Sequence, residues 1–253
     1  MVLNIAAYHF TPITAPAALV SELHAHAERN ALRGTVLVAS EGLNLFLAGA
    51  AEAIADFLDV LRADTRFADI VVKQSRSAEQ PFSQLKVKHK RETITFRQPD
   101  VSPLAGRAPA LAPATLARWI EQGHDDDGQR LVLLDTRNRE EIRHGTFAGA
   151  LTLPIDRFTD FPEAVAAQRE ALADATVVSF CTGGIRCEKA ALWMQASGID
   201  NVWQLDGGIL GYFEQVGDYG YEGHCFVFDQ RVALDAALQP LAAKPGPNGA
   251  AER

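Results

Sequence analysis

A dense run of prolines interrupts the middle of this chain. The segment from 98 to 113 contains Pro99, Pro103, Gly106, Pro109 and Pro113. Proline fixes φ and lacks the backbone N–H that helices and sheets need, so this density breaks regular structure. We interpret residues 98–112 as a linker that divides the 253 residues into a domain over 1–97 and a second over 113–220. Residues 221–253 form a C-terminal extension, expected to be disordered from about residue 244.

The composition is that of a soluble globular protein. Hydrophobic residues make up 47% of the chain and charged residues 22%, which suffices for a buried core in each half. Met1 to Ala7 lacks a basic stretch followed by an apolar run, and no segment approaches the roughly 18 apolar residues of a membrane span. We therefore expect a cytoplasmic protein with no membrane partner.

The hydrophobic pattern of the first domain predicts the order β-α-β-β-α-β. Strands are expected over 3–10, 34–40, 43–48 and 70–73, and helices over 15–30 and 51–61. In the first helix Leu19, Leu23 and Ala27 are spaced four apart and share one face. This order is typical of the ferredoxin-like α+β fold, and a further strand is expected over Leu85–Phe96.

The second domain alternates short strands and helices. Strands are expected over 131–135, 150–153, 176–180 and 202–205, with helices over 140–144, 163–173 and 188–196. Such alternation predicts an α/β domain around a parallel sheet, in which ligands bind beyond the carboxyl ends of the strands.

A cysteine stands at one of these strand ends. The strand over 176–180 leads into the loop Cys181, Thr182, Gly183, Gly184, Ile185, Arg186, and a helix is expected to open near Cys187. The glycines permit a sharp turn with free N–H groups, and the helix end adds positive potential. A thiolate or a persulfide at Cys181 would be stabilised there, so its reactivity should rise. The alternative is a buried structural cysteine beside an ordinary turn.

This loop resembles the active-site loop of the rhodanese superfamily. Cys181 and Arg186 bracket four residues, as in the sulfur-handling members, whereas related cysteine-dependent phosphatases have a loop one residue longer. Asp135-Thr136-Arg137 and Gly149-Ala150 fit the first strand and the following turn of that family. The resemblance implies that Cys181 is the catalytic residue, and Asp135 and Arg137 are expected to support the loop. Thr146 stands where many members have a histidine.

The remaining cysteines and histidines point to no metal site. Three cysteines are an odd number with spacing unlike a zinc site. Cys187 could act as a second thiol or be structural, and Cys225 is expected to pack in an added strand. His124-Asp125-Asp126 contains a His-x-Asp pair, but its polar, glycine-flanked surroundings are typical of a solvated loop.

A basic segment lies at the end of the first domain. Residues 73–97 hold seven basic side chains against two acidic ones, although the whole chain carries a net charge of −8. Alternation places Lys86, Lys88 and Lys90 on one face of a strand, followed by Arg91, in a line suited to phosphates. A charged edge strand that discourages aggregation is the other interpretation. We expect these four residues to bind RNA.

Longer strings of residues point to one family. Gly34-Thr35, the run Ser40 to Asn44, the run Pro81 to Lys90 and the run Cys181 to Lys189 are similar to the bacterial tRNA uridine(34) hydroxylase family. The resemblance covers roughly residues 1–235. It implies an acylphosphatase-like N-terminal domain before a rhodanese domain, and oxygen-dependent formation of 5-hydroxyuridine at the tRNA wobble position. Longer members continue into a cysteine-rich extension that this chain does not have.

The resemblance implies tRNA as the partner and molecular oxygen as co-substrate, with no other cofactor evident and no DNA bound. Two other functions stay open at the level of the sequence. One is a sulfurtransferase that takes sulfur from a small-molecule donor as a persulfide on Cys181. The other is a non-catalytic RNA-binding module, against which the intact Cys181 and Arg186 argue.

Overall fold

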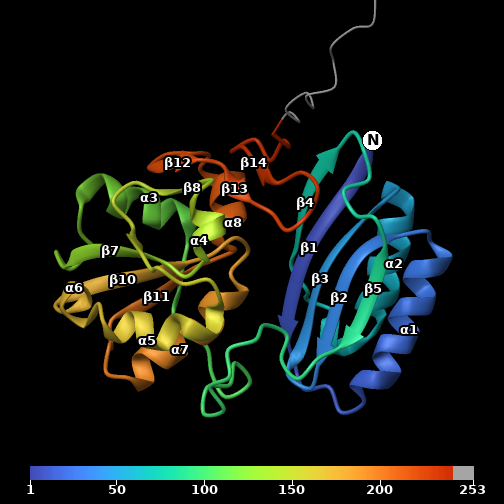
Figure 1. Ribbon diagram of the computed structural model, residues 1–253, viewed down its shortest axis with the longest axis horizontal. Helices are drawn as coiled ribbons and strands as arrows, with labels where there is room; N and C mark the ends of the chain where they lie inside the picture. Colours follow the sequence, from blue (N-terminus) through green and yellow to red (C-terminus); the bar gives the residue numbers. More distant parts are fainter. Residues whose placement is uncertain (242–253) are drawn as a thin grey trace, which may run out of the picture.

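The first sheet has five strands and stands between two helices and the second domain (Figure 1). The structure is a computed structural model that describes residues 1–241. The elements of this domain are β1 (Val2–Phe10), α1 (Pro16–Arg29), β2 (Arg33–Ala39), β3 (Gly42–Gly49), α2 (Ala51–Ala63), β4 (Val72–Ser77) and β5 (Leu85–His89), with a 3-10 turn at Thr65–Phe67. The strand order is β4-β1-β3-β2-β5, antiparallel except for the parallel β2–β5 pair.

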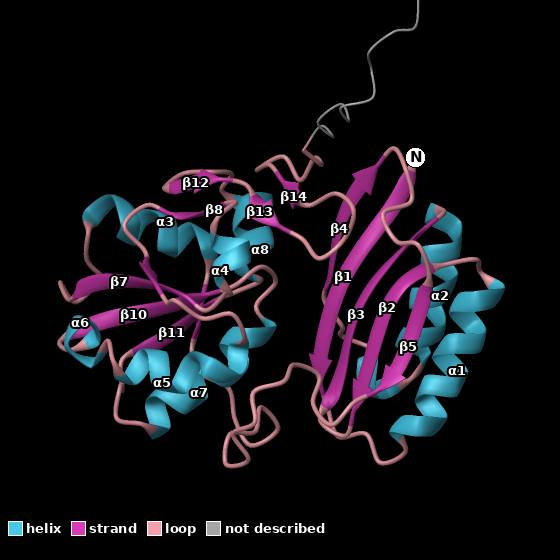
Figure 2. Ribbon diagram, viewed as in Figure 1, coloured by secondary structure: helices cyan, strands magenta, loops and turns pink. Residues whose placement is uncertain are grey.

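Helices α1 and α2 cover one face of this sheet. Leu19, Leu23 and Ala27 of α1 are buried, as their spacing predicts, and they join a core with residues of α2 and of the strands. The other face of the sheet turns toward the second domain (Figures 1 and 2). The predicted ferredoxin-like order is confirmed.

The second domain is built on a parallel sheet with helices on both faces (Figure 2). Its sheet has the order β6-β11-β10-β7-β9, with every pair parallel. The elements are β6 (Ala110–Leu111), α3 (Pro113–Gln122), β7 (Arg130–Asp135), α4 (Arg139–Ile142), β8 (Gly145–Phe147), β9 (Leu151–Thr152), α5 (Phe161–Ala166), α6 (Arg169–Leu172), β10 (Ala175–Phe180), α7 (Ile185–Ala196), β11 (Val202–Leu205), α8 (Gly208–Gln215), β12 (Tyr221–Gly223), β13 (Cys225–Phe226) and β14 (Ala233–Leu234), with a 3-10 turn at Phe158–Asp160.

The last strand of the first domain is shorter than the sequence predicts. β5 ends at His89 rather than near Phe96, because its partner β2 ends there and Lys90 N–H makes a last bond to the Val38 carbonyl. After His89, side-chain carboxylates rather than a neighbouring strand accept the backbone hydrogen bonds. Glu41 accepts hydrogen bonds from Thr93, and Glu92 accepts them from the backbone N–H groups at 96 and 97.

Three other boundaries also differ from the sequence prediction. β4 begins at Val72 rather than Ile70, because the Ile70 N–H is bonded to Phe67 in the preceding turn. The helix expected over 163–173 is two short helices, α5 and α6, separated where Gln168 leaves helical dihedral angles. Helix α7 begins at Ile185 and not near Cys187, so the end of the cysteine loop is already helical.

The proline-rich segment contributes to the second domain. Phe96 is buried and stacks on Phe158 with ring centroids 4.6 Å apart, and Ala108 belongs to the same core. Ala110–Leu111 forms edge strand β6 beside β11. The sheet therefore includes two residues of the predicted linker. The tail expected from about residue 244 lies outside the described residues.

Candidate active site

Strand β10 carries Cys181 into the interior of the second domain. All residues of β10 are buried, and the strand lies between β11 and β7. Cys181 is 1% exposed. The carbonyls of Cys181 and Thr182 accept hydrogen bonds from backbone N–H groups of α8 at 2.9 and 3.0 Å. The loop is thus held by the strand before it and by a second helix beside it.

Gly184 gives the loop its turn around the sulfur. Its φ of +105° is in the region that favours glycine, and its N–H donates a hydrogen bond to Cys181 Sγ at 3.1 Å. Helix α7 begins at the next residue, so its positive end lies beside the sulfur. This is the anion cradle that the glycines of the loop predict.

The cradle favours the ionised form of Cys181. Burial alone opposes ionisation, but hydrogen bonding from Cys187, the charge of Arg186 and backbone N–H groups outweigh it and lower the pKa of Cys181 to about 5. At neutral pH the thiolate is then the main species, and the thiolate is the nucleophilic form of cysteine. The same donors suit the terminal sulfur of a persulfide.

The structure brings Cys187 next to Cys181. Burial and the neighbouring Cys181 raise the pKa of Cys187, while its Sγ lies 3.7 Å from Thr136 Oγ1. Cys187 is therefore a neutral thiol that hydrogen-bonds to the Cys181 sulfur. Cys225 is buried in β13 as the sequence predicts, and burial raises its pKa to about 12.

Arg186 is fixed by a partner that sequence reasoning missed. Its guanidinium donates two hydrogen bonds to the carboxylate of Glu141 in α4, at 2.6 and 2.7 Å. Both side chains are almost fully buried. Burial acts against the charge of Glu141, but Arg186 outweighs it and lowers the pKa of that carboxyl. The pair anchors the end of the cysteine loop to α4.

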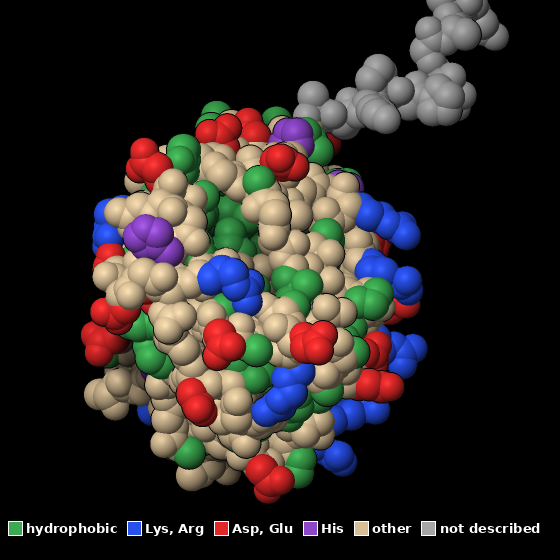
Figure 3. Space-filling model, turned by 90° about the vertical axis from the view of Figure 1, so that its left-hand side faces the viewer, with side chains coloured by type: hydrophobic (Ala, Val, Ile, Leu, Met, Phe, Trp, Pro, Cys, Tyr) green, Lys and Arg blue, Asp and Glu red, His purple; other side chains and the backbone are tan. Residues whose placement is uncertain are grey.

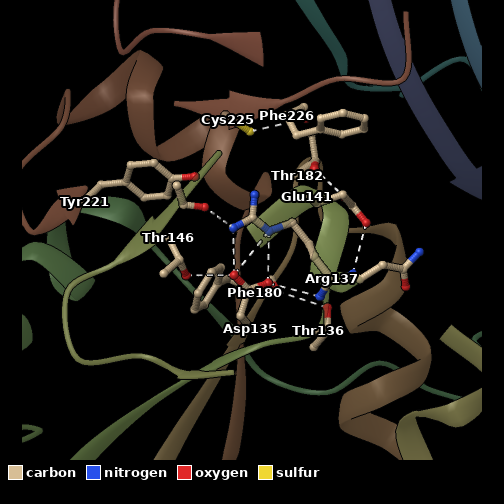
Figure 4. Close-up of polar contacts among 12 residues, drawn as sticks. Asp135, Thr136, Arg137, Glu141, Thr146, Phe180, Thr182, Tyr221, Cys225 and Phe226 are labelled. Atoms are coloured by element: carbon tan, nitrogen blue, oxygen red, sulfur yellow. Dashed lines mark hydrogen bonds and ion pairs between the residues drawn. The ribbon is translucent and has the colours of Figure 1, made fainter. Parts of the chain in front are cut away.

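Asp135 and Arg137 form a second buried pair behind the loop (Figure 4). Arg137 donates to both carboxylate oxygens of Asp135 and to the Gly145 carbonyl, and neither side chain is exposed. Thr146, at the position of the family's histidine, donates to Asp135 at 2.7 Å. Thr136 lies between them in the sequence, and its hydroxyl donates to the carbonyl of Phe180, the last residue of β10. This geometry fits the bracing role predicted for Asp135 and Arg137.

The cysteine loop borders a large cavity between the two domains. The cavity has a volume of about 1030 Å³, and both domains line it. From the first domain its wall includes Tyr8, Phe46 and Arg97, and from the second Phe158, Cys181 and Gly183. The Cys181 side of the cavity thus borders a space that neither domain encloses alone.

Tyr8 extends from β1 to the cysteine loop. Its hydroxyl donates to Glu188 of α7 at 3.0 Å, and Glu188 also accepts hydrogen bonds from Arg107 and Gln204. Burial and the charge of Glu188 raise the pKa of Tyr8. Tyr8 therefore remains a neutral donor at the wall of the cavity.

Ion pairs join the two domains around this site. Lys189 of α7 is 2% exposed and donates to Glu41 at 2.8 Å and to Glu92 at 2.9 Å. Lys73 of β4 donates to Glu214 of α8 at 2.7 Å. Glu41 lies in the turn between β2 and β3, and Lys189 lies in α7. Both residues belong to the sequence runs that resemble the family, which was the available signal.

The predicted RNA-binding residues lie apart from the cysteine loop. All four residues are exposed at the sheet edge farthest from β4: Lys86 and Lys88 lie on β5, and Lys90 and Arg91 directly follow it. In the His124-Asp125-Asp126 run, Asp125 accepts hydrogen bonds from Thr176 and from two turn N–H groups, while Asp126 pairs with Arg118. Within residues 1–241 no helix is long and apolar enough to cross a membrane.

Comparison with known proteins covers nearly the whole chain. Residues 2–93 match the family model for the UPF0176 acylphosphatase-like domain, and residues 113–215 match the rhodanese-like domain. The chain is 66% identical to a tRNA uridine(34) hydroxylase of Xanthomonas campestris pv. campestris strain 8004, over 95% of each chain.

Two other relatives bear the same name. The tRNA uridine(34) hydroxylase of Xanthomonas oryzae pv. oryzae strain PXO99A is 61% identical over 98% of this chain and 99% of its own. That of Xylella fastidiosa strain 9a5c is 60% identical over 95% of this chain and 94% of its own. With its acylphosphatase-like domain, its rhodanese domain and this identity, the chain belongs to the tRNA uridine(34) hydroxylase family.

Proposed function

We propose that this protein hydroxylates uridine 34 of tRNA to 5-hydroxyuridine, with Cys181 as its reactive residue. The observation that carries the proposal is a cysteine whose sulfur accepts a hydrogen bond from the Gly184 N–H at 3.1 Å, at the wall of a cavity between two domains. The names of the relatives supply the reaction and the substrate.

The size of the cavity suits a nucleotide taken out of a folded RNA. Its volume of about 1030 Å³ is just above the range of about 300–1,000 Å³ for small-molecule sites. Enzymes that act on a base take it out of its stack and into a pocket.

A small sulfur acceptor would need neither this space nor the basic strand of the first domain, whereas a polyanion needs a second contact surface.

Hydroxylation at C5 inserts an oxygen atom and therefore needs an oxidant. We take molecular oxygen as the co-substrate: one oxygen atom replaces the C5 hydrogen as a hydroxyl group, and the other leaves as water with two protons and two electrons from a diffusible two-electron reductant. We assign no resident cofactor. Cys181 supplies the nucleophilic sulfur, while Arg186 and the loop N–H groups hold its negative charge. We propose that the protein acts in the cytoplasm, which a tRNA substrate supports.

The second candidate function is sulfur transfer from a small-molecule donor. The observation that favours it is the cradle itself, because the Gly184 N–H at 3.1 Å from Sγ would serve a persulfide equally well. Thiosulfate chemistry in vitro would therefore not separate the two functions.

Modified-nucleoside analysis of cellular tRNA separates them. Deletion of the gene, or Cys181→Ser, should lower 5-hydroxyuridine and the nucleosides derived from it, while thiolated uridines stay constant. Cys225→Ser is the matched control, because that thiol is buried with a pKa of about 12. Loss of thiolated uridines with hydroxylated ones unchanged would replace the hydroxylase with the sulfurtransferase.

A further inference from the structure

The face of the first sheet that turns away from helices α1 and α2 carries an aromatic residue at its centre. Phe46 lies on the middle strand β3, where it pairs with Ala6 of β1 and with Thr35 of β2. Ala6 in turn pairs with Lys73, and Thr35 pairs with Lys86. Paired residues point to the same side of a sheet, so these five side chains form one row across all five strands.

This row is on the side away from helices α1 and α2. The residues that alternate with it, such as Leu45, Leu47 and Val36, are buried in the core beneath those helices. Phe46 itself is only partly buried and lines the cavity between the domains. Its ring is therefore available to a ligand that enters the cavity.

Positive charge is concentrated at one edge of the same face. Leu37 pairs with Lys88, one row along from the pair of Thr35 and Lys86, so both lysines point to the side of Phe46. Both are exposed. At the opposite edge the charge of Lys73 is balanced by Glu214 at 2.7 Å. An anionic backbone is thus favoured over β5 and not over β4.

The outer face of the second domain has a mixed charge. Acidic and basic side chains are interspersed over the middle of that face (Figure 3). The row through Phe46 instead has lysines along one edge, on the side of the sheet that lines the cavity with Cys181.

We propose that this sheet face binds single-stranded RNA, namely anticodon-loop nucleotides next to the target uridine, with a base stacked on Phe46 and phosphates at Lys86 and Lys88. The inference rests on the proposed function and deepens it, because it names the part of the tRNA held and the residue that holds it. A sheet whose central strands present aromatic rings is a general solution for single-stranded RNA.

The spacing between strands is consistent with one RNA strand crossing the sheet from β5 toward β1. From β5 to β1 there are three interstrand spacings of about 4.8 Å, or roughly 14 Å. Phe46 lies one strand away from β1, whose Tyr8 contacts the helix that follows the cysteine loop. A chain held by its phosphates over β5 and directed toward Cys181 would therefore cross Phe46.

The test measures binding of a fluorescently labelled anticodon stem–loop RNA to the full chain. Phe46→Ala should weaken binding by roughly 5- to 150-fold, which corresponds to about 1–3 kcal/mol for one stacked base. Phe46→Leu should also bind weakly, because it keeps apolar volume without a planar ring, whereas Phe46→Tyr should bind like the unmodified protein. The matched control is Tyr219→Ala, which removes an aromatic side chain that is 49% exposed outside the cavity.

Two further measurements separate the possible failures. Thermal unfolding and Cys181 alkylation report whether Phe46→Ala has left the fold and the cysteine loop intact. Unchanged RNA affinity and unchanged hydroxylation in a folded Phe46→Ala variant would overturn the stacking site but leave the proposed function in place. If tRNA lacks any hydroxylation by the unmodified protein, the proposed function fails, while the RNA-binding series still decides the role of Phe46.

Discussion

The Tyr8 hydroxyl, on a strand of the first domain, donates a 3.0 Å hydrogen bond to the Glu188 carboxylate in the helix that follows the cysteine loop. The same hydroxyl would lie only 2.8 Å from a Cβ added at Gly184. The loop around the reactive sulfur is therefore shaped by both domains, and its geometry depends on their contact.

Gly184→Ala should slow the reaction of Cys181 at neutral pH and lower stability. An alanine there must adopt a φ of +105° and approach Tyr8, and such backbone strain costs about 1–3 kcal/mol. Gly183→Ala is the control, because an added Cβ meets nothing within 4 Å there. Alkylation rates and thermal melting of both variants check this. Equal effects of the two substitutions would contradict it.

Alkylation of Cys181 should depend on pH with a midpoint near 5. Its pKa is lowered to about 5, so the thiolate persists at neutral pH and is lost only as the pH falls through that value. The rate with iodoacetamide should rise up to about pH 6 and then level off, in contrast to an ordinary thiol, whose rate rises up to a pKa of about 8.5. Peptide mapping identifies the modified residue. Faster modification of Cys187 or Cys225 would refute the assignment of Cys181.

Replacement of Cys187 should shift this midpoint upward. Hydrogen bonding from Cys187 is among the interactions that lower the pKa of Cys181, and alanine removes the donor. Cys187→Ser keeps a donor and should retain most of the low midpoint. The measurement is the alkylation rate of Cys181 against pH in both variants. A midpoint that stays near 5 in Cys187→Ala would mean that the loop N–H groups and Arg186 suffice.

Glu141→Ala should destabilise the protein by about 3–5 kcal/mol, because it leaves the charge of Arg186 buried without its partner. Asp156→Ala removes the partner of Arg139 in an exposed pair and should leave the unfolding free energy nearly unchanged. Denaturant unfolding of both variants provides the comparison. Similar unfolding midpoints would show that the buried pair contributes no more than a surface one.

Replacement of Lys86, Lys88, Lys90 and Arg91 by Gln should weaken tRNA binding and flatten its salt dependence. Each phosphate contact with single-stranded nucleic acid contributes about −0.7 to the slope of log K against log salt concentration, so four lost contacts remove up to roughly 3. Arg29→Gln with Arg62→Gln, on the helical side of the sheet, is the control. An unchanged slope in a folded protein would return these residues to the role of a charged edge strand.

Local patterns predicted most of the elements and the position of the cysteine loop at the end of a core strand. The four-residue spacing of Leu19, Leu23 and Ala27 identified a helix face, and the apolar run before Cys181 identified a core strand, because both signals lie within one element. The end of β5 could not be found in this way. It depends on where β2 stops and on carboxylates of Glu41 and Glu92 that take over the backbone N–H groups.

The partners of the site residues were beyond local reasoning. Glu141 lies 45 positions from Arg186, and Tyr8 lies 180 positions from Glu188. Such contacts are produced by the packing of elements and leave no periodic trace in the sequence. The one hint in the sequence was the charge of Arg186, Glu188 and Lys189 directly after a core strand. The structure buries all three of these side chains in the first turns of α7.

The ion pairs of Lys189 across the domain boundary affect how the protein unfolds. The Lys189 ammonium is 2% exposed and its two carboxylate partners, Glu41 and Glu92, belong to the first domain, so separation of the domains would break both ion pairs at once. Calorimetry should accordingly record one cooperative heat-absorption peak for the whole chain, and either half produced as a fragment should melt at a lower temperature than the intact protein.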